Sequence, residues 1–138
     1  MSKETNRNRK GTEIMTKEFI PYEQALALKE LGFDESTYTW RQHGNGISGD
    51  VEGKRDYYNR KGDVYVALPT YSQTFRWFRE KYNLWNMIYP RDGWNYHIQG
   101  IDSTISCYGE SWDKTKISTP EEAELECLTK LIEIVKNK

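Results

Sequence analysis

The sequence lacks long hydrophobic runs and has few cysteines and prolines. Its 138 residues include 4 Pro and 2 Cys. No apolar run approaches the roughly 20 residues of a bilayer-spanning helix, and the N-terminus lacks the apolar core of a signal peptide. Cys107 and Cys127 form neither a CxxC pair nor a small-domain disulfide pattern, so we expect reduced thiols. These absences predict a soluble, cytoplasmic protein.

The chain also lacks an excess of charge of either sign. It has 20 Lys and Arg against 21 Asp and Glu, so no whole-molecule field attracts it to nucleic acid or to an anionic membrane. Any such binding must come from a local patch. Aromatic residues, in contrast, make up 14% of the chain within an apolar fraction of 36%. Their rings must supply much of the core or lie on the surface.

The first 17 residues differ in composition from the rest of the chain. Residues 1–17 hold five Lys or Arg and few apolar groups, so they cannot offset the entropy lost on ordering. We predict a disordered basic arm here, either a solvated tail or an arm that contacts nucleic acid. Residues 18–138 are long enough to bury a core of their own, and we predict that they form a single domain.

Periodicity and capping residues predict three helices. The first begins after Pro21 and ends before Gly32, the second covers 71–83, and the third begins at Thr119 and Pro120. Alternation, turn residues and short apolar runs predict strands at 37–43, 64–68, 84–89, 94–101 and about 104–108. The turn residues of PRDG predict a hairpin between the strands at 84–89 and 94–101, and we expect the polar, glycine-rich stretch 44–63 to be a long hairpin connection or a mobile loop. This order shows no β-α-β alternation. The predicted fold class is therefore α+β, with one antiparallel sheet of four to five strands and three helices packed on it.

The second predicted helix, within PTYSQTFRWFREKYN, is unusually rich in aromatic residues. Spacing of i, i+4, i+7 and i+11 places four of them in one stripe, which we interpret as core: Tyr71, Phe75, Phe78 and Tyr82. Trp77 lies away from that stripe. Its ring either covers the margin of the core or serves as an exposed anchor for a partner, because Trp is enriched in binding hot spots.

Arg76 and Arg79 form a further stripe on the same helix. Guanidinium groups bind phosphates and carboxylates through paired hydrogen bonds, so this flank is a candidate contact for an anionic group. The competing interpretation is a solvated face with an ion pair, which contributes little to stability.

A second candidate surface combines aromatic rings with arginines. Trp40 and Arg41 belong to it, and such side chains stack on bases or nucleotides. Its further members are Tyr38, Tyr57, Tyr58, Trp94, Tyr96, Trp112, Arg55 and Arg60. The competing interpretation is that the strand faces carrying these rings form the inner side of the sheet.

Motifs for catalysis and metal binding are weak. GNGISG (44–49) has the spacing of a dinucleotide-binding loop, but it lacks a buried strand before it and a helix after it. His97 and Cys107 are the one pair to consider for nucleophilic catalysis, and nothing near Cys107 predicts a lowered pKa. The sequence has no HExxH motif, calcium loop or paired Cys/His spacing. We therefore predict no metal, no cofactor and no enzymatic activity.

Three stretches of the chain carry a resemblance. EFIPYEQALALKELGFDE, PTYSQTFRWFREKYN and EEAELECLTKLIEIVKNK resemble a recurrent group of short uncharacterised proteins encoded by phages, prophages and mobile elements of gut bacteria. They cover a little over a third of the chain. The group has no assigned activity, so no residue roles are transferred. The resemblance implies a small accessory protein that acts on host or phage components in a bacterial cytoplasm.

The sequence thus predicts a non-enzymatic protein that binds a host or phage protein through Trp77, with Arg76 and Arg79 as flanking contacts. The alternative hypothesis is that the aromatic and arginine surface around Trp40 and Arg41 binds a nucleotide signal or single-stranded nucleic acid. An uncharacterised enzyme is the third hypothesis. We expect no membrane association.

Overall fold

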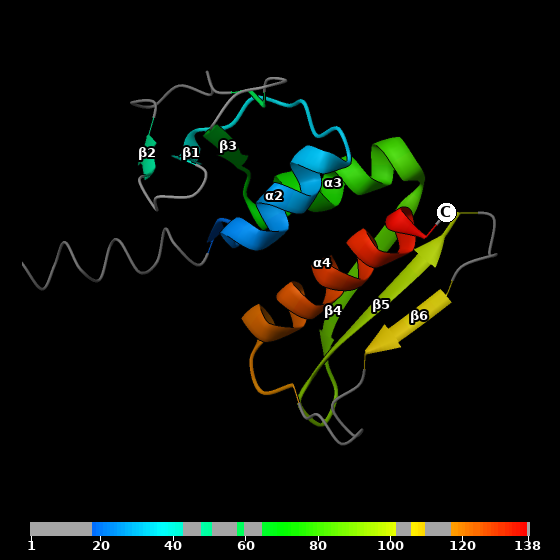
Figure 1. Cartoon of the computed structure of the whole chain (residues 1–138). Helices are drawn as coiled ribbons and strands as arrows, with labels where there is room; N and C mark the ends of the chain where they lie inside the picture. Colours follow the sequence, from blue (N-terminus) through cyan, green and yellow to red (C-terminus); the bar gives the residue numbers. More distant parts are fainter. Residues whose placement is uncertain are drawn as a thin grey trace, which may run out of the picture. The chain divides into compact units, whose positions relative to one another are not determined.

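The structure is a computed structural model that describes residues 18–42, 48–50, 58–59, 65–101, 106–109 and 117–137. These residues contain three helices and six strands (Figure 1). The chain divides into two compact units, residues 1–71 and 72–138. The predicted arm lies outside the described residues, and the single domain over 18–138 stays a prediction. None of the helices in the described part is long and apolar enough to cross a membrane.

Helix α2 (Tyr22–Glu30) of the first unit confirms the first predicted helix. Its end depends on Gly32, whose φ of 95° is a left-handed conformation that glycine adopts without a steric penalty. The next residue stays hydrogen-bonded to the end of the helix, because the N–H of Phe33 donates to the carbonyl of Leu28 at 2.9 Å. Phe33 is buried as a result.

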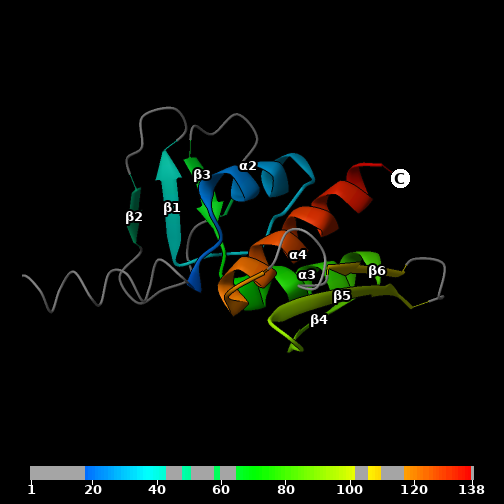
Figure 2. The same cartoon turned by 90° about the horizontal axis from the view of Figure 1, so that it is seen from below.

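The first unit also contains a three-stranded antiparallel sheet in the order β2-β1-β3 (Figure 2). Its strands are β1 (Thr39–Gln42), β2 (Ser48–Asp50) and β3 (Tyr65–Leu68). The central strand pairs Trp40 with Ala67 on one side and with Gly49 on the other. Helix α2 packs against β3. The predicted strands at 37–43 and 64–68 are confirmed, whereas β2 falls in a stretch that we predicted to be a connection.

Helix α3 (Tyr71–Tyr82) matches the predicted second helix, and its aromatic stripe is core as expected. Tyr71, Phe75 and Phe78 are buried, and Tyr82 is half-buried. The helix ends at Asn83, which has a φ of 55°. Asparagine tolerates this left-handed conformation better than most residues, so the chain can turn directly into the next strand.

The second unit holds a separate three-stranded antiparallel sheet in the order β4-β5-β6. Its strands are β4 (Leu84–Pro90), β5 (Trp94–Gly100) and β6 (Ser106–Gly109). The predicted hairpin between β4 and β5 is confirmed. Its turn uses positive φ at Asp92 (54°) and Gly93 (117°). The side-chain amide of Asn95 donates to the carbonyl of Arg91 at 3.0 Å and so stabilises the turn.

Helix α4 (Pro120–Lys136) begins with the predicted cap. The hydroxyl of Thr119 accepts a hydrogen bond from the N–H of Glu122 at 3.1 Å. The carboxylate of Glu122 in turn accepts from the N–H of Ser118 at 3.0 Å. These two bonds satisfy donors that would otherwise be unpaired at the helix start.

One face of the second sheet is covered by α4, which runs across β4 and β5 (Figures 1 and 2). The helix contributes a wide apolar face to this core: Ala123, Cys127, Leu128, Leu131, Ile132 and Val135. Leu84 and Ile98 meet it from the strands and are almost fully buried. Burial raises the pKa of the Cys127 thiol to about 12, although a hydrogen bond with Asn86 opposes the shift and Glu124 adds to it. A thiol in this state is a packing group and not a nucleophile.

The α+β fold class is confirmed, but the expectation of one sheet of four to five strands is corrected. The described strands form two sheets of three strands each. The physical reason lies in the connections. Every described strand pairs only with strands of its own compact unit, and the tight turn between β4 and β5 commits these two strands to each other.

Candidate binding face

The second sheet has a face that α4 does not cover, and it carries the largest exposed apolar side chains of the second unit. Strand alternation separates the two faces, because successive side chains point to opposite sides. Leu84 and Ile98 lie on the covered side. Trp85 pairs with Gln99, and Met87 pairs with His97, on the other side. We call this second side the open face; it consists of Trp85, Met87, His97, Gln99 and, just beyond β5, Ile101.

Exposure on the open face is high for residues of this kind. Trp85 is 52% exposed, Met87 55% and Ile101 68%. Single exposed apolar residues are normal on protein surfaces, but three such side chains around one site are not. The open face therefore differs from an ordinary solvated sheet surface.

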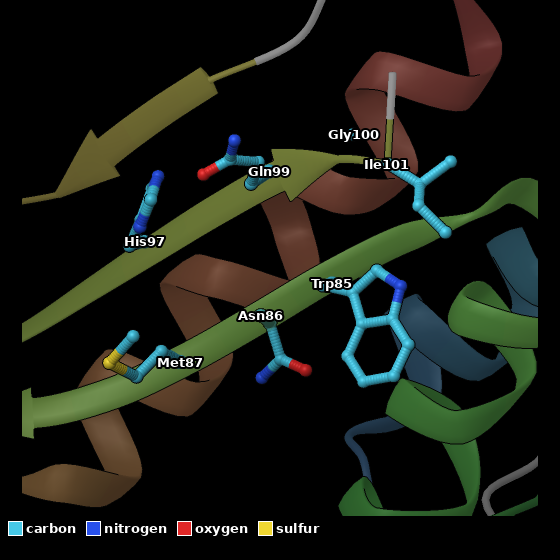
Figure 3. Close-up of a pocket in the computed structure, with 7 residues that line it drawn as sticks. All are labelled: Trp85, Asn86, Met87, His97, Gln99, Gly100 and Ile101. Carbon is cyan, nitrogen blue, oxygen red and sulfur yellow. The ribbon is translucent and has the colours of Figure 1, made fainter. Parts of the chain in front are cut away.

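These side chains surround a shallow hollow of about 380 Å³ (Figure 3). It is lined by Trp85, Asn86, Met87, His97, Gln99, Gly100 and Ile101. The close-up shows Trp85 and Met87 projecting from β4, His97 and Gln99 from β5, and α4 behind the strands. Apolar groups surround a few amide and imidazole groups, which is the composition of a recognition surface.

A cation borders the hollow. The guanidinium carbon of Arg79 lies 5.4 Å from the centroid of the Trp85 ring. This distance is within the range of a cation–π interaction, which orients both side chains. None of the lining residues carries a carboxylate. The open face thus combines apolar area with positive charge at one border.

Trp77, the predicted anchor, is buried and only 3% exposed. Its indole contacts the rings of Phe78 and Tyr82 edge-on, at centroid distances of 5.1 and 5.4 Å. The ammonium of Lys81 lies 5.1 Å from the Trp77 ring. The indole is therefore unavailable as an exposed anchor, and this prediction is corrected. Around the helix axis Trp77 lies at a wide angle from the aromatic stripe. It is buried nevertheless, because α3 is covered on more than one side.

The predicted arginine flank divides into two different environments. Arg76 is exposed and lies 3.8 Å from the carboxylate of Glu80, one turn later on α3. An exposed pair of this kind contributes little to stability. Arg79 is half-buried and stacks on Trp85. The contact with Trp85 places Arg79 at the border of the open face.

The predicted aromatic and arginine surface has members in both units, and its described rings are partly packed. Trp40 is half-buried and contacts Tyr65 edge-on, with ring centroids 4.7 Å apart. The guanidinium carbon of Arg41 lies 4.7 Å from the centroid of the Tyr22 ring. Tyr38 and Tyr58 are exposed, whereas Trp94 is half-buried and Tyr96 buried. Four predicted members lie outside the described residues: Arg55, Tyr57, Arg60 and Trp112.

The residues considered for catalysis are neighbours in the sheet without being directly opposite. His97 pairs with Tyr108, while Cys107 pairs with Ile98. The described end of GNGISG continues into strand β2 and not into a helix, so it offers no helix N-terminus to a phosphate. Within the described ranges, no cluster of three or more His, Cys, Asp and Glu residues is placed to hold a metal ion.

Comparisons with protein families, curated proteins and solved structures find no match to this chain. The support for the candidate site therefore comes from the geometry of its residues.

The sequence-based prediction missed Trp85, Met87 and Ile101. One signal was present in LWNMIY, where apolar residues occupy both parities of a strand. Such a strand exposes some of them unless both faces of its sheet are covered. The sequence does not indicate which parity faces α4.

Proposed function

We propose that this chain is a non-enzymatic accessory protein that binds a protein partner through the open face of the β4-β5-β6 sheet. The observation that carries the proposal is the group of exposed apolar side chains around one hollow: Trp85, Met87 and Ile101. Trp is the residue type most often found at binding hot spots, and methionine adapts to irregular partner surfaces.

The border of the hollow indicates the chemistry of the partner. Arg79 supplies a positive charge next to Trp85, and no lining residue supplies a negative one. A segment with an apolar side chain beside a carboxylate complements this surface, since the apolar group enters the hollow while the carboxylate meets the guanidinium. The partner that fits is therefore a protein with an acidic and apolar contact patch.

The sequence resemblance supplies the proposed biological setting. The resemblance to small proteins of phages, prophages and mobile elements implies an accessory role on host or phage components, so we expect the partner to be a host or phage protein in the bacterial cytoplasm. Arg76 is the other arginine of the predicted flank, and it is exposed on α3. We propose only a minor contribution of Arg76 to partner binding, because its guanidinium is already paired with Glu80.

A second candidate function is binding of a nucleotide signal or single-stranded nucleic acid. The observation that favours it is the recurrence of arginine on aromatic rings, at Arg79 on Trp85 and at Arg41 on Tyr22. Such groups offer both a π-face for a base and a charge for a phosphate. Trp40 and Arg41 are consecutive in β1, so their side chains point to opposite faces, and the half-buried Trp40 ring belongs to the face away from the Arg41–Tyr22 pair.

The proposal is tested with Trp85→Ala in the full chain. A partner is first identified by crosslinking in host or phage-infected cells and is then purified, so that binding is measured by calorimetry between two defined proteins. We expect Trp85→Ala to weaken binding at least tenfold, which is about 1.4 kcal/mol. Tyr38→Ala is the matched control, because it also removes an exposed aromatic ring, 43% exposed, from the first unit.

Unchanged affinity in Trp85→Ala, with a native thermal transition, contradicts the assignment of the open face.

A thermal-shift panel of nucleotides and oligonucleotides tests the second candidate function, because a ligand of the folded state raises the melting temperature. A rise that is lost in Arg79→Ala supports nucleotide binding at the open face. A rise that is lost only in Arg41→Ala assigns it to the first unit.

A further inference from the structure

Strand β3 lies at one edge of the first sheet, and among the described strands only β1 is beside it (Figure 2). Its backbone N–H and C=O groups therefore alternate between β1 and the outer edge. The N–H of Ala67 donates to the side-chain oxygen of Asn59 at 2.9 Å, so Ala67 is an outward residue. Tyr65 and Pro69 share this parity and are outward as well. The backbone groups of Val66 point toward β1.

Two further parts of the first unit bond to the same outer edge. The ammonium of Lys29, on α2, donates to the carbonyl of Tyr65 at 2.9 Å. The N–H of Ile20 donates to the carbonyl of Pro69 at 3.0 Å. Each of the three outward residues thus has a backbone group that is already hydrogen-bonded. An edge strand normally presents unpaired groups to which another strand can add, and covering it with other segments prevents this.

Asn59 differs from the other two partners because it uses both ends of its side-chain amide. Its oxygen accepts from Ala67, and its nitrogen donates to the carbonyl of Phe33 at 3.0 Å. An amide supplies an acceptor and a donor side by side, which an N–H and a carbonyl together require. Phe33 comes three residues after the last residue of α2. One side chain therefore joins the exit of α2 to the outer edge of β3.

The two bonds of Asn59 lie in a poorly hydrated part of the unit. Ala67 and Phe33 are each only 1% exposed, and Asn59 itself is half-buried. Water has little access to replace the amide as a partner. Breaking these bonds therefore costs more than breaking similar bonds at an exposed site.

We propose that Asn59 is a clasp, a conformational lock that holds the outer edge of β3 and the exit of α2 together. The Ala67 amide can exchange with solvent, or pair with an added strand, only when this clasp opens. The inference goes beyond the proposed function, because it concerns the first unit and the open face belongs to the second. Its failure would leave partner binding at the open face unaffected.

The wild-type chain provides the first test, by hydrogen exchange read at single amides with NMR. An outward edge amide that is bonded only to water exchanges nearly as fast as in an unfolded chain. We expect the Ala67 amide instead to be protected to within about tenfold of the Val66 amide, which is bonded inside the sheet. The Asn59 proton donated to Phe33 should also exchange more slowly than side-chain amide protons in water. Unprotected exchange at Ala67 overturns the inference.

Asn59→Ala removes both bonds and tests the clasp directly. We expect exchange of the Ala67 amide to become at least about tenfold faster, because its buried acceptor is lost. The Val66 amide should change less, since its bond to β1 remains. Tyr58→Ala is the matched control, because it removes the neighbouring side chain, 47% exposed, and keeps both bonds of Asn59. The control should exchange at Ala67 with the wild-type rate.

The comparison of the two amides separates a local clasp from a general loss of stability. A selective increase at Ala67 supports the clasp. An equal increase at Ala67 and Val66 overturns it, because global destabilisation raises exchange throughout a cooperative unit. An unchanged rate at Ala67 overturns it as well. The wild-type measurement decides the question if Asn59→Ala fails to fold.

Discussion

The two faces of the second sheet come from the same two strands, yet they have opposite environments. Leu84 and Ile98 on the covered face are almost fully buried beneath α4. Trp85 and Met87, on the open face, keep more than half of their side-chain surface in solvent. The strand sequence is apolar at both parities, so composition does not distinguish the faces. The difference shows that a covering helix, and not strand hydrophobicity, decides which residues are core.

The sharpest test of this comparison is a pair of alanine substitutions on neighbouring strands. Ile98→Ala leaves a cavity beneath α4 and should lower the free energy of unfolding by about 2–5 kcal/mol. Met87→Ala removes a side chain of similar size from the open face and should change it by about 0.5 kcal/mol or less. Urea unfolding followed by circular dichroism measures both. Equal losses would show that the two faces are buried alike and would remove the basis for a binding face.

A smaller effect is expected from the cap of the covering helix. Thr119→Ala removes the acceptor for the N–H of Glu122 and should cost about 1 kcal/mol. Thr129→Ala is the matched control, because its hydroxyl donates to the carbonyl of Leu125 within the same helix at 2.8 Å. Alanine is a better helix former than threonine, so the control should be neutral or slightly stabilising. Equal destabilisation in the two variants would argue that the cap has no special role.

The smallest effect concerns a carboxyl group on α4 and depends on pH. Burial, with a smaller contribution from Glu121, raises the pKa of Glu124 above 4.5. The folded state therefore disfavours the ionised form. The resulting penalty is absent below pH 4.5, grows as pH rises through the folded-state pKa, and reaches its full size above that pKa.

Glu124→Gln should accordingly be more stable than the wild type at neutral pH, by less than about 1 kcal/mol because the group is partly solvated. The gain should disappear in acid. Glu133→Gln is the control, since Glu133 lies 3.3 Å from Lys130 and its loss should be neutral or slightly unfavourable. Thermal melting at neutral and acidic pH measures both variants. A gain at Glu124 that does not change with pH would exclude the titration as its cause.

Local features of the fold followed from the sequence to a large extent. Thr119 and Pro120 marked the start of α4, and Gly32 marked the end of α2. The turn before Trp94 formed the predicted hairpin. Each of these depends on backbone conformations and hydrogen bonds within a few residues, which a short stretch of sequence specifies.

The candidate site was far less predictable. Helical spacing separated Trp77 from the aromatic stripe, but spacing describes only directions around a helix and not how much of its surface is covered. Trp85 was assigned to a strand without an indication of which face it lay on. Such misses arise because exposure depends on every element that packs against a residue, and those elements are distant in sequence.

The sequence by itself determined the helices, most strands, the turns and the α+β class of this protein, because these depend on short-range sterics, capping and periodicity. Only the tertiary structure decided that the strands divide into two sheets, that Trp77 is sealed in the core, and that Trp85 and Met87 are left in solvent. The physical reason is that strand pairing and burial join residues far apart in the chain. A single apolar strand is compatible with either face until a helix covers one of them.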